Sequence, residues 1–270
     1  MPFVDSRGAR ISYADTGTGA GVLLIQGIGL IGEGWRPQVE GLRDRYRLLT
    51  FDNRGIGASE LGGGEVSIEA MAADAWAVAD AAGLERVHVV GHSMGGVIAQ
   101  EVALVAPRRV RSLSLLCAFA SGRQAATLSP GMMWTGLCTR VGPRAFRRNA
   151  FLSLVLPPAE LARVDRAAEA ARLAPLFGHD LADQPPIVMK QLRATARYDA
   201  RDRLATLAAI PTLVLSAELD RIAQPRFGRE LAAAIPGALY EEIPGAAHGV
   251  PISSPAAVNA RLAAHFAAAR

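Results

Sequence analysis

Five consecutive residues, Gly91-His92-Ser93-Met94-Gly95, have the clearest chemical potential in this 270-residue chain. They form a Gly-x-Ser-x-Gly pattern between an apolar run that ends at Gly91 and a helical pattern that starts after Ser93. Such a strand-to-helix turn strains the backbone of the serine and tolerates only glycine-sized neighbours. The free N–H groups of the following helix favour negative charge beside the serine. Ser93 is therefore predicted to be a nucleophile; the alternative is a serine that only caps the helix.

A serine hydroxyl reacts well only when a base removes its proton and a third group orients that base. Of the five histidines, His248 lies in a loop of small residues after the last expected strand, where it can reach the carboxyl end of a sheet. His88 lies within an expected strand, and the turn should direct the side chain of His92 elsewhere. His179 lies in the insertion between two expected strands, and His265 lies late in the last expected helix. We expect His248 to be the base; the alternative is a loop histidine without this role.

The acid that orients the base is expected just after another apolar strand. Asp220 follows the run at residues 212–216 and precedes a helical pattern, so it should also lie at the carboxyl edge of the sheet. Glu218 is two residues away and has the right chemistry, and it is the competing candidate. We favour Asp220, and the resulting order Ser, Asp, His is the one used by sheets with this kind of turn.

The elements that must position these residues alternate between short β-type runs and helical patterns, which predicts an α/β fold with a mostly parallel sheet. A hairpin is expected over residues 3–14, followed by strands at residues 22–26, 47–52, 86–91, 110–116, 212–216 and 239–243. One helix should begin after the N-cap Ser67 and end before Gly83. The last helix should begin at Ser254-Pro255, an N-cap followed by proline.

The alternation stops between residues 121 and 202, where no convincing strand occurs. Helical segments are expected there at about residues 159–173 and 186–198. We therefore expect a core domain built from residues 1–121 and 203–270, interrupted by a helical insertion at residues 122–202.

Together these residues resemble the α/β-hydrolase superfamily over nearly the whole chain. Residues 91–96 resemble its nucleophile elbow, residues 217–220 its acid loop and residues 247–248 its base loop. Residues 51–59 resemble a turn of the family that is usually structural. The resemblance implies a mostly parallel, twisted sheet flanked by helices, with the insertion as a helical cap.

The oxyanion hole of this family commonly follows a His-Gly pair, and Gln26-Gly27 stands there in this chain. The backbone N–H groups of Ile28 and Met94 are the expected donors, since they do not depend on side-chain identity. Gln26 is expected to orient the loop or touch substrate, or only to bond neighbouring backbone. Trp35 and Trp134 are candidates for the substrate pocket that are equally suited to a core.

The resemblance implies hydrolysis of a carboxylic ester, or a related acyl bond, of a small molecule through an acyl-enzyme. The same three residues would also serve a lactonase, a C–C bond hydrolase, a cofactor-free perhydrolase or an acyltransferase. A non-catalytic ligand-binding module is the remaining alternative, because a fold does not name a substrate. Haloalkane dehalogenases and epoxide hydrolases of this superfamily have aspartate at the elbow, and the serine disfavours both.

Residue spacing and charge also bear on whether the protein binds a metal, a cofactor or nucleic acid. The histidines and acids lack metal-ligand spacing, and Gly62-Gly63-Gly64 lacks the lysine of a phosphate loop, so we expect neither metal nor cofactor. The net charge of +4 is spread over scattered arginines, which disfavours nucleic acid and fits solvated helix faces; an anionic substrate or partner is the alternative.

The cysteines and the N-terminal sequence bear on the cellular compartment of the protein. Cys117 and Cys138 could pair, although two cysteines are not a disulfide framework, and Cys117 fits a small core residue. The N-terminus lacks the features of a signal peptide, and no apolar run is long enough to span a bilayer. A cytoplasmic protein is expected, of an oligomeric state that the sequence does not indicate.

Overall fold

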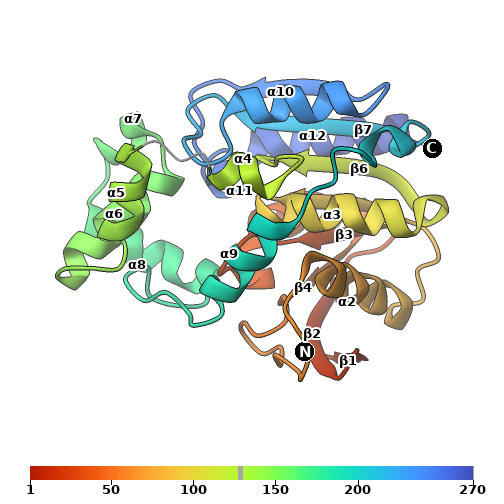
Figure 1. The fold of residues 1–270 in the computed structure, drawn as a ribbon, viewed down its shortest axis with the longest axis horizontal. Helices are drawn as coiled ribbons and strands as arrows, with labels where there is room; N and C mark the ends of the chain where they lie inside the picture. Colours follow the sequence, from red (N-terminus) through yellow and green to blue (C-terminus); the bar gives the residue numbers. More distant parts are fainter. Residues whose placement is uncertain (127–129, 270) are drawn as a thin grey trace.

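A computed structural model describes residues 1–126 and 130–269 (Figure 1). Its strands form one eight-stranded sheet in the order β1-β2-β4-β3-β5-β6-β7-β8. The strands are β1 (Phe3–Ser6), β2 (Ala9–Thr16), β3 (Ala20–Ile25), β4 (Tyr46–Phe51), β5 (Val87–His92), β6 (Val110–Leu116), β7 (Thr212–Ala217) and β8 (Leu239–Ile243). Each of them matches an expected strand to within two residues.

The sheet is parallel from β4 to β8, and only β1 and β2 run antiparallel to their neighbours. The hairpin expected over residues 3–14 is the pair β1 and β2. Because β3, β5, β6 and β7 are parallel, their carboxyl ends lie at one edge of the sheet, where ligand sites of open α/β sheets form.

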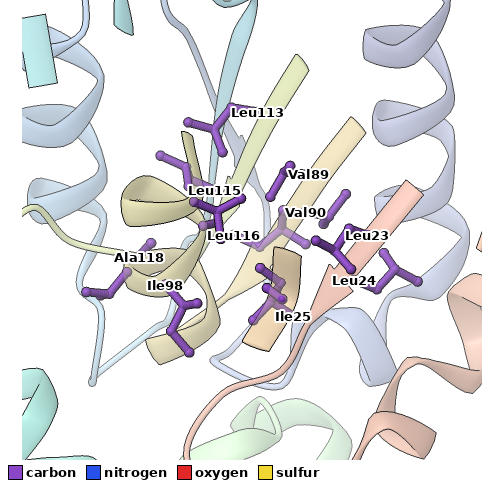
Figure 2. Packing of buried hydrophobic residues seen from close by; sticks show 14 of the residues in the cluster. Leu23, Leu24, Ile25, Val89, Val90, Ile98, Leu113, Leu115, Leu116 and Ala118 are labelled. Atoms are coloured by element: carbon purple, nitrogen blue, oxygen red, sulfur yellow. The ribbon is translucent and has the colours of Figure 1, made fainter. Parts of the chain in front are cut away.

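The central strands are buried on both faces, as their continuous apolar runs predict. Figure 2 shows Leu23, Val89 and Leu115 of adjacent strands in one buried cluster, which also contains Ile98 from the helix after β5. Cys117 belongs to this core, and both cysteines are free thiols, so the possible disulfide is absent.

Helices flank the sheet, with α2 packed on α3 and α1 packed on α12 (Figure 1). These and the remaining core helices are α1 (Arg36–Leu42), α2 (Ile68–Ala81), α3 (Met94–Val105), α10 (Pro225–Ala234), α11 (Val250–Ser253) and α12 (Pro255–Ala268). Ser67 caps α2 as predicted, because its hydroxyl accepts a hydrogen bond from the N–H of Ala70 at 3.1 Å. Ser254 stands at the N-cap of α12, but its side chain makes no capping hydrogen bond, so that expectation holds only for the position.

In its described residues, the segment between β6 and β7 contains helices and connecting turns but no strand, apart from one isolated bridge between Ser121 and Asp199. Its helices are α4 (Gly122–Ala126), α5 (Pro130–Cys138), α6 (Arg144–Val155), α7 (Pro158–Leu161), α8 (Arg166–Phe177) and α9 (Val188–Arg197). Residues 159–173, expected to be helical, belong mostly to α7 and α8. Asp165 separates the two helices, because it starts α8 by accepting a hydrogen bond from the N–H of Ala168.

This insertion has a small hydrophobic cluster of its own. The cluster contains Leu152 and Val155 of α6 and Leu173 and Phe177 of α8, and Leu30 of the core packs against it. In Figure 1, α5, α6, α7 and α8 stand beside the body that contains the sheet, and α9 leads back towards it. Among the described residues, no helix is long and apolar enough to cross a membrane.

A buried ion pair joins the turn after β4 to α2. The Nε and Nη2 atoms of Arg54 donate to the two carboxylate oxygens of Asp74 at 2.7 and 2.6 Å, and both side chains are at most 1% exposed. Two parallel, charge-assisted hydrogen bonds fix both groups in direction as well as distance. The turn at residues 51–59 is therefore structural in this chain, as its resemblance implies.

Removing one partner of this pair should be costly, since the other charge stays buried without compensation. We expect Asp74→Asn to lower the free energy of unfolding by about 3–5 kcal/mol. The matched control is Asp15→Asn: the partly exposed Asp15 pairs with Arg47 at 2.6 Å, and its loss should cost about 0–1 kcal/mol. Urea unfolding followed by circular dichroism measures both, and equal losses would contradict the role given to burial.

Candidate active site

Ser93 occupies the turn between β5 and α3 with φ 57° and ψ −122°. A positive φ is uncommon for a residue with a side chain, so this is the strained turn that the Gly-x-Ser-x-Gly pattern predicts. A Cβ atom at Gly91 would overlap the carbonyl of Gly95, and one at Gly95 would overlap the carbonyl of Ile25. Although Ser93 precedes α3, its side chain makes no capping hydrogen bond. The hydroxyl is thus not used as a helix cap.

The structure brings Ser93, His248 and Asp220 into one hydrogen-bonded chain. The Nε2 atom of His248 lies 3.0 Å from Oγ of Ser93, and its Nδ1 atom lies 2.7 Å from Oδ2 of Asp220. A carboxylate only accepts hydrogen bonds, so Nδ1–H donates to Asp220 and Nε2 is left to accept from the serine hydroxyl. All three residues are buried, at 9% exposed or less.

Asp220 is held as a carboxylate by its surroundings. Burial alone would raise its pKa, but the charge and hydrogen bond of His248, together with the N–H groups of Ile222 and Ala223, lower the pKa below its ordinary value. These two N–H groups donate to Oδ1 at 2.8 and 2.9 Å. The competing acid, Glu218, instead accepts a hydrogen bond from the N–H of Gly245 at 2.7 Å. Asp220 is therefore the acid that contacts the histidine.

The loop after β3 lies directly against Ser93. A Cβ atom added at Gly27 would be 3.1 Å from Cβ of Ser93. The N–H of Ile28 makes no hydrogen bond with the described part of the chain. Met94 is the first residue of α3, where an N–H has no intrahelical acceptor. Two backbone donors are thus placed next to the serine without partners of their own.

Gln26 is buried, lines the cavity beside Ser93, and accepts a hydrogen bond from the N–H of Gly27 at 3.2 Å. Gln26 therefore bonds neighbouring backbone and also faces the cavity, so these two expectations do not exclude each other. The backbone carbonyl oxygen of Gln26 accepts a separate hydrogen bond from Nδ2 of Asn53 at 3.0 Å. The turn after β4 therefore supports the loop after β3.

Two residues of the insertion also hold this loop, and sequence reasoning missed both. Oε1 of Gln191 accepts a hydrogen bond from the N–H of Gly29 at 2.9 Å, and Nε2 of His179 lies 3.1 Å from the carbonyl oxygen of the same glycine. Both partners are at least 150 residues away along the chain. No local pattern could have indicated these contacts.

The turn was expected to direct the side chain of His92 elsewhere, but it packs against His248. Its Nε2 atom lies 2.8 Å from the carbonyl oxygen of His248, and the two ring centroids are 5.0 Å apart. Burial lowers the pKa of His92 to about 3, so the ring is neutral near pH 7. A carbonyl only accepts, which makes Nε2–H the donor.

The two tryptophans expected near the substrate lie elsewhere. Trp35 is fully buried behind the site, with its ring edge-on to that of His92 at 6.4 Å. Trp134 is 66% exposed on α5, one turn before the cavity residue Leu137. Neither side chain is among those that line the cavity: Trp35 belongs to the core, and Trp134 is largely exposed.

A cavity of about 550 Å³ opens beside Ser93 and His248. Most of its lining is apolar and comes from the loop after β3 and from α5, α6, α8 and α9, including Leu30, Leu137, Phe151, Leu154, Phe177, Val188, Met189 and Leu192. A second cavity of about 710 Å³ is lined by Asp220 and Arg166 but not by Ser93. The first cavity is therefore the one in which a bound molecule would meet the serine.

One group of potential metal ligands occurs among the described residues: His92, Cys117 and His248, whose ligand atoms lie within 4.8 Å of one another. Both ring nitrogens of His248 face Asp220 and Ser93, and His92 donates to a carbonyl. Burial, then the charge and hydrogen bond of Asp220, raise the pKa of the Cys117 thiol. A metal needs a thiolate, so this group fits a packed polar cluster better than an ion site.

The model of the family described as the alpha/beta hydrolase fold matches residues 22–255. The chain belongs to this family. A protein of Azorhizobium caulinodans with the provisional name carbamate hydrolase RutD is 32% identical over 97% of both chains. A thermophilic esterase from Thermogutta terrifontis has a TM-score of 0.80 with 26% identity over 99% of this chain and 98% of its own.

An enol-lactonase from Burkholderia xenovorans also has a TM-score of 0.80, with 25% identity over 98% of this chain and all of its own. Relatives that span the whole chain are therefore named as hydrolases of several kinds. The alpha/beta hydrolase described here is an enzyme, and its relatives indicate hydrolase activity.

The buried histidines predict a dependence of stability on pH. Burial lowers the pKa of His92 to about 3 and that of His88 to about 4, and His88 bonds Ser112 Oγ at 2.8 Å. In the unfolded chain both titrate near 6.5, so from about pH 6.5 downwards the unfolded state binds more protons and stability falls. The urea midpoint should be lower at about pH 5.5 than at about pH 7.5.

The variant His88→Gln isolates this effect, because it removes one of the titrating groups at a distance from Ser93. Its urea midpoint should change less between the two pH values than that of the unaltered protein. An equal change in both proteins would contradict the assignment of His88 as a neutral, buried group.

Proposed function

We propose that this enzyme is a serine hydrolase that cleaves a carboxylic ester, or a related acyl bond, of a small molecule through an acyl-enzyme. The observation that supports the proposal is the chain of hydrogen bonds from Ser93 through His248 to Asp220. This arrangement has the nucleophile, the base and the orienting acid that acyl transfer to serine requires.

In the first half of the reaction, Oγ of Ser93 attacks the substrate carbonyl carbon while Nε2 of His248 takes the hydroxyl proton. Asp220 stabilises the imidazolium that forms, since its carboxylate already bonds Nδ1–H. The carbonyl oxygen becomes negative and accepts hydrogen bonds from the N–H groups of Ile28 and Met94. The carbon–oxygen bond to the alcohol then breaks, and His248 returns the proton to the leaving oxygen.

In the second half, a water molecule gives a proton to His248 and attacks the acyl carbon. The bond from this carbon to Oγ of Ser93 then breaks, His248 returns the proton to Oγ, and the acid is released. Every proton in this cycle moves through Nε2 of one histidine. His92 acts as a positioning residue, because its hydrogen bond holds the backbone of His248. The mechanism requires neither a metal nor an organic cofactor.

Residues 122–202 act in this proposal as a helical cap over a core domain of residues 1–121 and 203–270. The support is that α5, α6 and α9 line the cavity with Ser93. The N–H of Gly249, next to the base, also donates to the carbonyl oxygen of Val155 at 2.8 Å. The cap thereby shapes the acyl site and restrains the loop of the base.

Esters, lactones and carbamates all present a carbonyl with an oxygen leaving group, so the same residues are suited to each. Relatives of this chain are named for all three reactions. A matched panel of these substrates, with product analysis in the presence of alcohols and amines, ranks the bonds cleaved and separates hydrolysis from acyl transfer.

Replacing the nucleophile tests the proposal directly. Ser93→Ala should lower kcat on p-nitrophenyl butyrate by about a thousandfold or more, because no other group can form the acyl-enzyme. A fluorophosphonate probe should label the unaltered enzyme but not this variant. Ser254→Ala, which alters a serine outside the site, should keep both activity and labelling. Retained turnover in Ser93→Ala would refute the proposal.

The two acids of the loop after β7 provide a matched pair of variants. Asp220→Asn should lower kcat by about 10³–10⁴-fold, since an amide cannot stabilise the imidazolium or hold the required tautomer. Glu218→Gln should change kcat by less than about tenfold, because Glu218 bonds only the N–H of Gly245. Steady-state kinetics on one ester measures both, and the reverse ranking would assign the acid role to Glu218.

A further inference from the structure

The cavity beside Ser93 has an uneven distribution of charge. Among the described residues, Arg140, which follows α5, is the only arginine or lysine in its lining. No aspartate or glutamate lines this cavity among the described residues. A cavity with one cation and a largely apolar wall favours a molecule that is apolar with a single negative group.

Arg140 lies where the cavity meets solvent. Its neighbours in the lining, Leu137 and Met189, are 49% and 42% exposed, whereas Ser93 is only 9% exposed. Arg140 therefore marks the open end of the cavity and Ser93 its buried end. A molecule that reaches both must have an apolar segment between its negative group and the bond that is cleaved.

The charge of Arg140 is not neutralised by the protein. Its Nη1 atom lies 2.9 Å from Sδ of Met189, and no carboxylate of the described residues is within ion-pair distance of it. The nearby arginines differ: Arg144 bonds Asp180 and Asp183, and Arg148 bonds Asp180. Arg140 thus keeps guanidinium donors for a ligand, while its neighbours serve to hold the insertion together.

A second polar group of the lining is also available. The amide of Gln184 lines the same cavity and makes no hydrogen bond with other described residues. Its N–H groups can donate to an anion in the same way as those of Arg140, without adding charge. Two side chains in the lining therefore have unused donors, which is the complement of a carboxylate.

The wider charge distribution agrees with this arrangement. Residues 122–202 contain 12 lysines and arginines against 7 aspartates and glutamates, whereas the rest of the chain contains 17 against 18. The net positive charge of the protein therefore lies in the insertion that borders the cavity. Such a field raises the local concentration of anions and the rate at which they arrive.

From these observations we infer that the enzyme prefers substrates with a carboxylate at the end of an apolar segment remote from the scissile bond, and that Arg140 binds this carboxylate. The inference rests on the proposed function, since Ser93 defines the reacting end of the cavity. It adds a substrate class, the anionic half-esters and related acyl compounds, and a residue that determines specificity.

The test compares matched pairs of esters that differ only in terminal charge. Mono-p-nitrophenyl esters of dicarboxylic acids, from succinate to sebacate, are assayed beside p-nitrophenyl esters of monocarboxylic acids of equal length. A second pair, the butanoyl esters of 4-hydroxybenzoate and of its methyl ester, places the charge on the leaving group. For at least one acyl-chain length, or for the charged leaving group, kcat/KM should be higher for the anionic ester than for its neutral partner. Added salt should reduce this preference.

Two variants locate the preference. Arg140→Gln should reduce the ratio of anionic to neutral kcat/KM by about tenfold, and Arg140→Glu should invert it. The matched control is Arg144→Gln, which removes an arginine that is nearby but paired and outside the cavity lining. This control should keep the ratio of the unaltered enzyme. An absent preference, or one that survives in Arg140→Gln, would overturn the inference.

A binding measurement separates this inference from the proposed function. Calorimetry with the Ser93→Ala variant should show tighter binding of a half-methyl dicarboxylate than of the matched dimethyl ester, and the additional change Arg140→Gln should remove the difference. If neutral esters are hydrolysed through Ser93 but no difference in binding occurs, only the inference fails. If binding differs but Ser93→Ala retains turnover, only the proposed function fails.

Discussion

The left-handed backbone of Ser93 is the constraint on which the rest of the site depends. A residue with a side chain at this positive φ costs about 1–3 kcal/mol, and the conformation persists only where its surroundings enforce it. Here the backbone of Gly91 lies close to that of Gly95, and the backbone of Gly95 lies close to that of Ile25. These close contacts hold the chain on both sides of Ser93. The serine hydroxyl is thereby fixed at the carboxyl edge of the sheet, with the first amides of α3 beside it.

Everything that Ser93 needs comes from loops at that same edge, and the loops are tied to one another. His92 bonds the backbone of His248, Asn53 bonds that of Gln26, and the N–H of Leu219 donates to the carbonyl oxygen of Ala246 at 2.8 Å. Gln191 adds a tie from the insertion. Each loop therefore has its geometry set by a neighbour, and the cavity walls and the reacting groups form one connected structure.

Local patterns predicted the strands well, because an apolar run buried between two layers of helices reads the same in sequence as in space. The apolar run at residues 110–116 became β6 without change. The edge strand β8 also has the expected bounds, residues 239–243, although most of it is exposed or half-buried. Local sequence patterns failed where contacts with other residues decide the position or role of a side chain. Asp165 divides what looked like one helix, Ser254 leaves its capping role unused, and Trp35 and Trp134 lie in the core and on the surface.

The sequence by itself determined the order of strands and helices along the chain, the strained serine turn and the types of reacting group, since these follow from neighbouring residues. Only the tertiary structure decided that His248 meets Ser93 and that Asp220, not Glu218, meets His248. It also decided that Arg140 borders the cavity without a carboxylate partner. The physical reason is distance along the chain: these contacts join loops that the order of strands in the sheet, not any local periodicity, brings together.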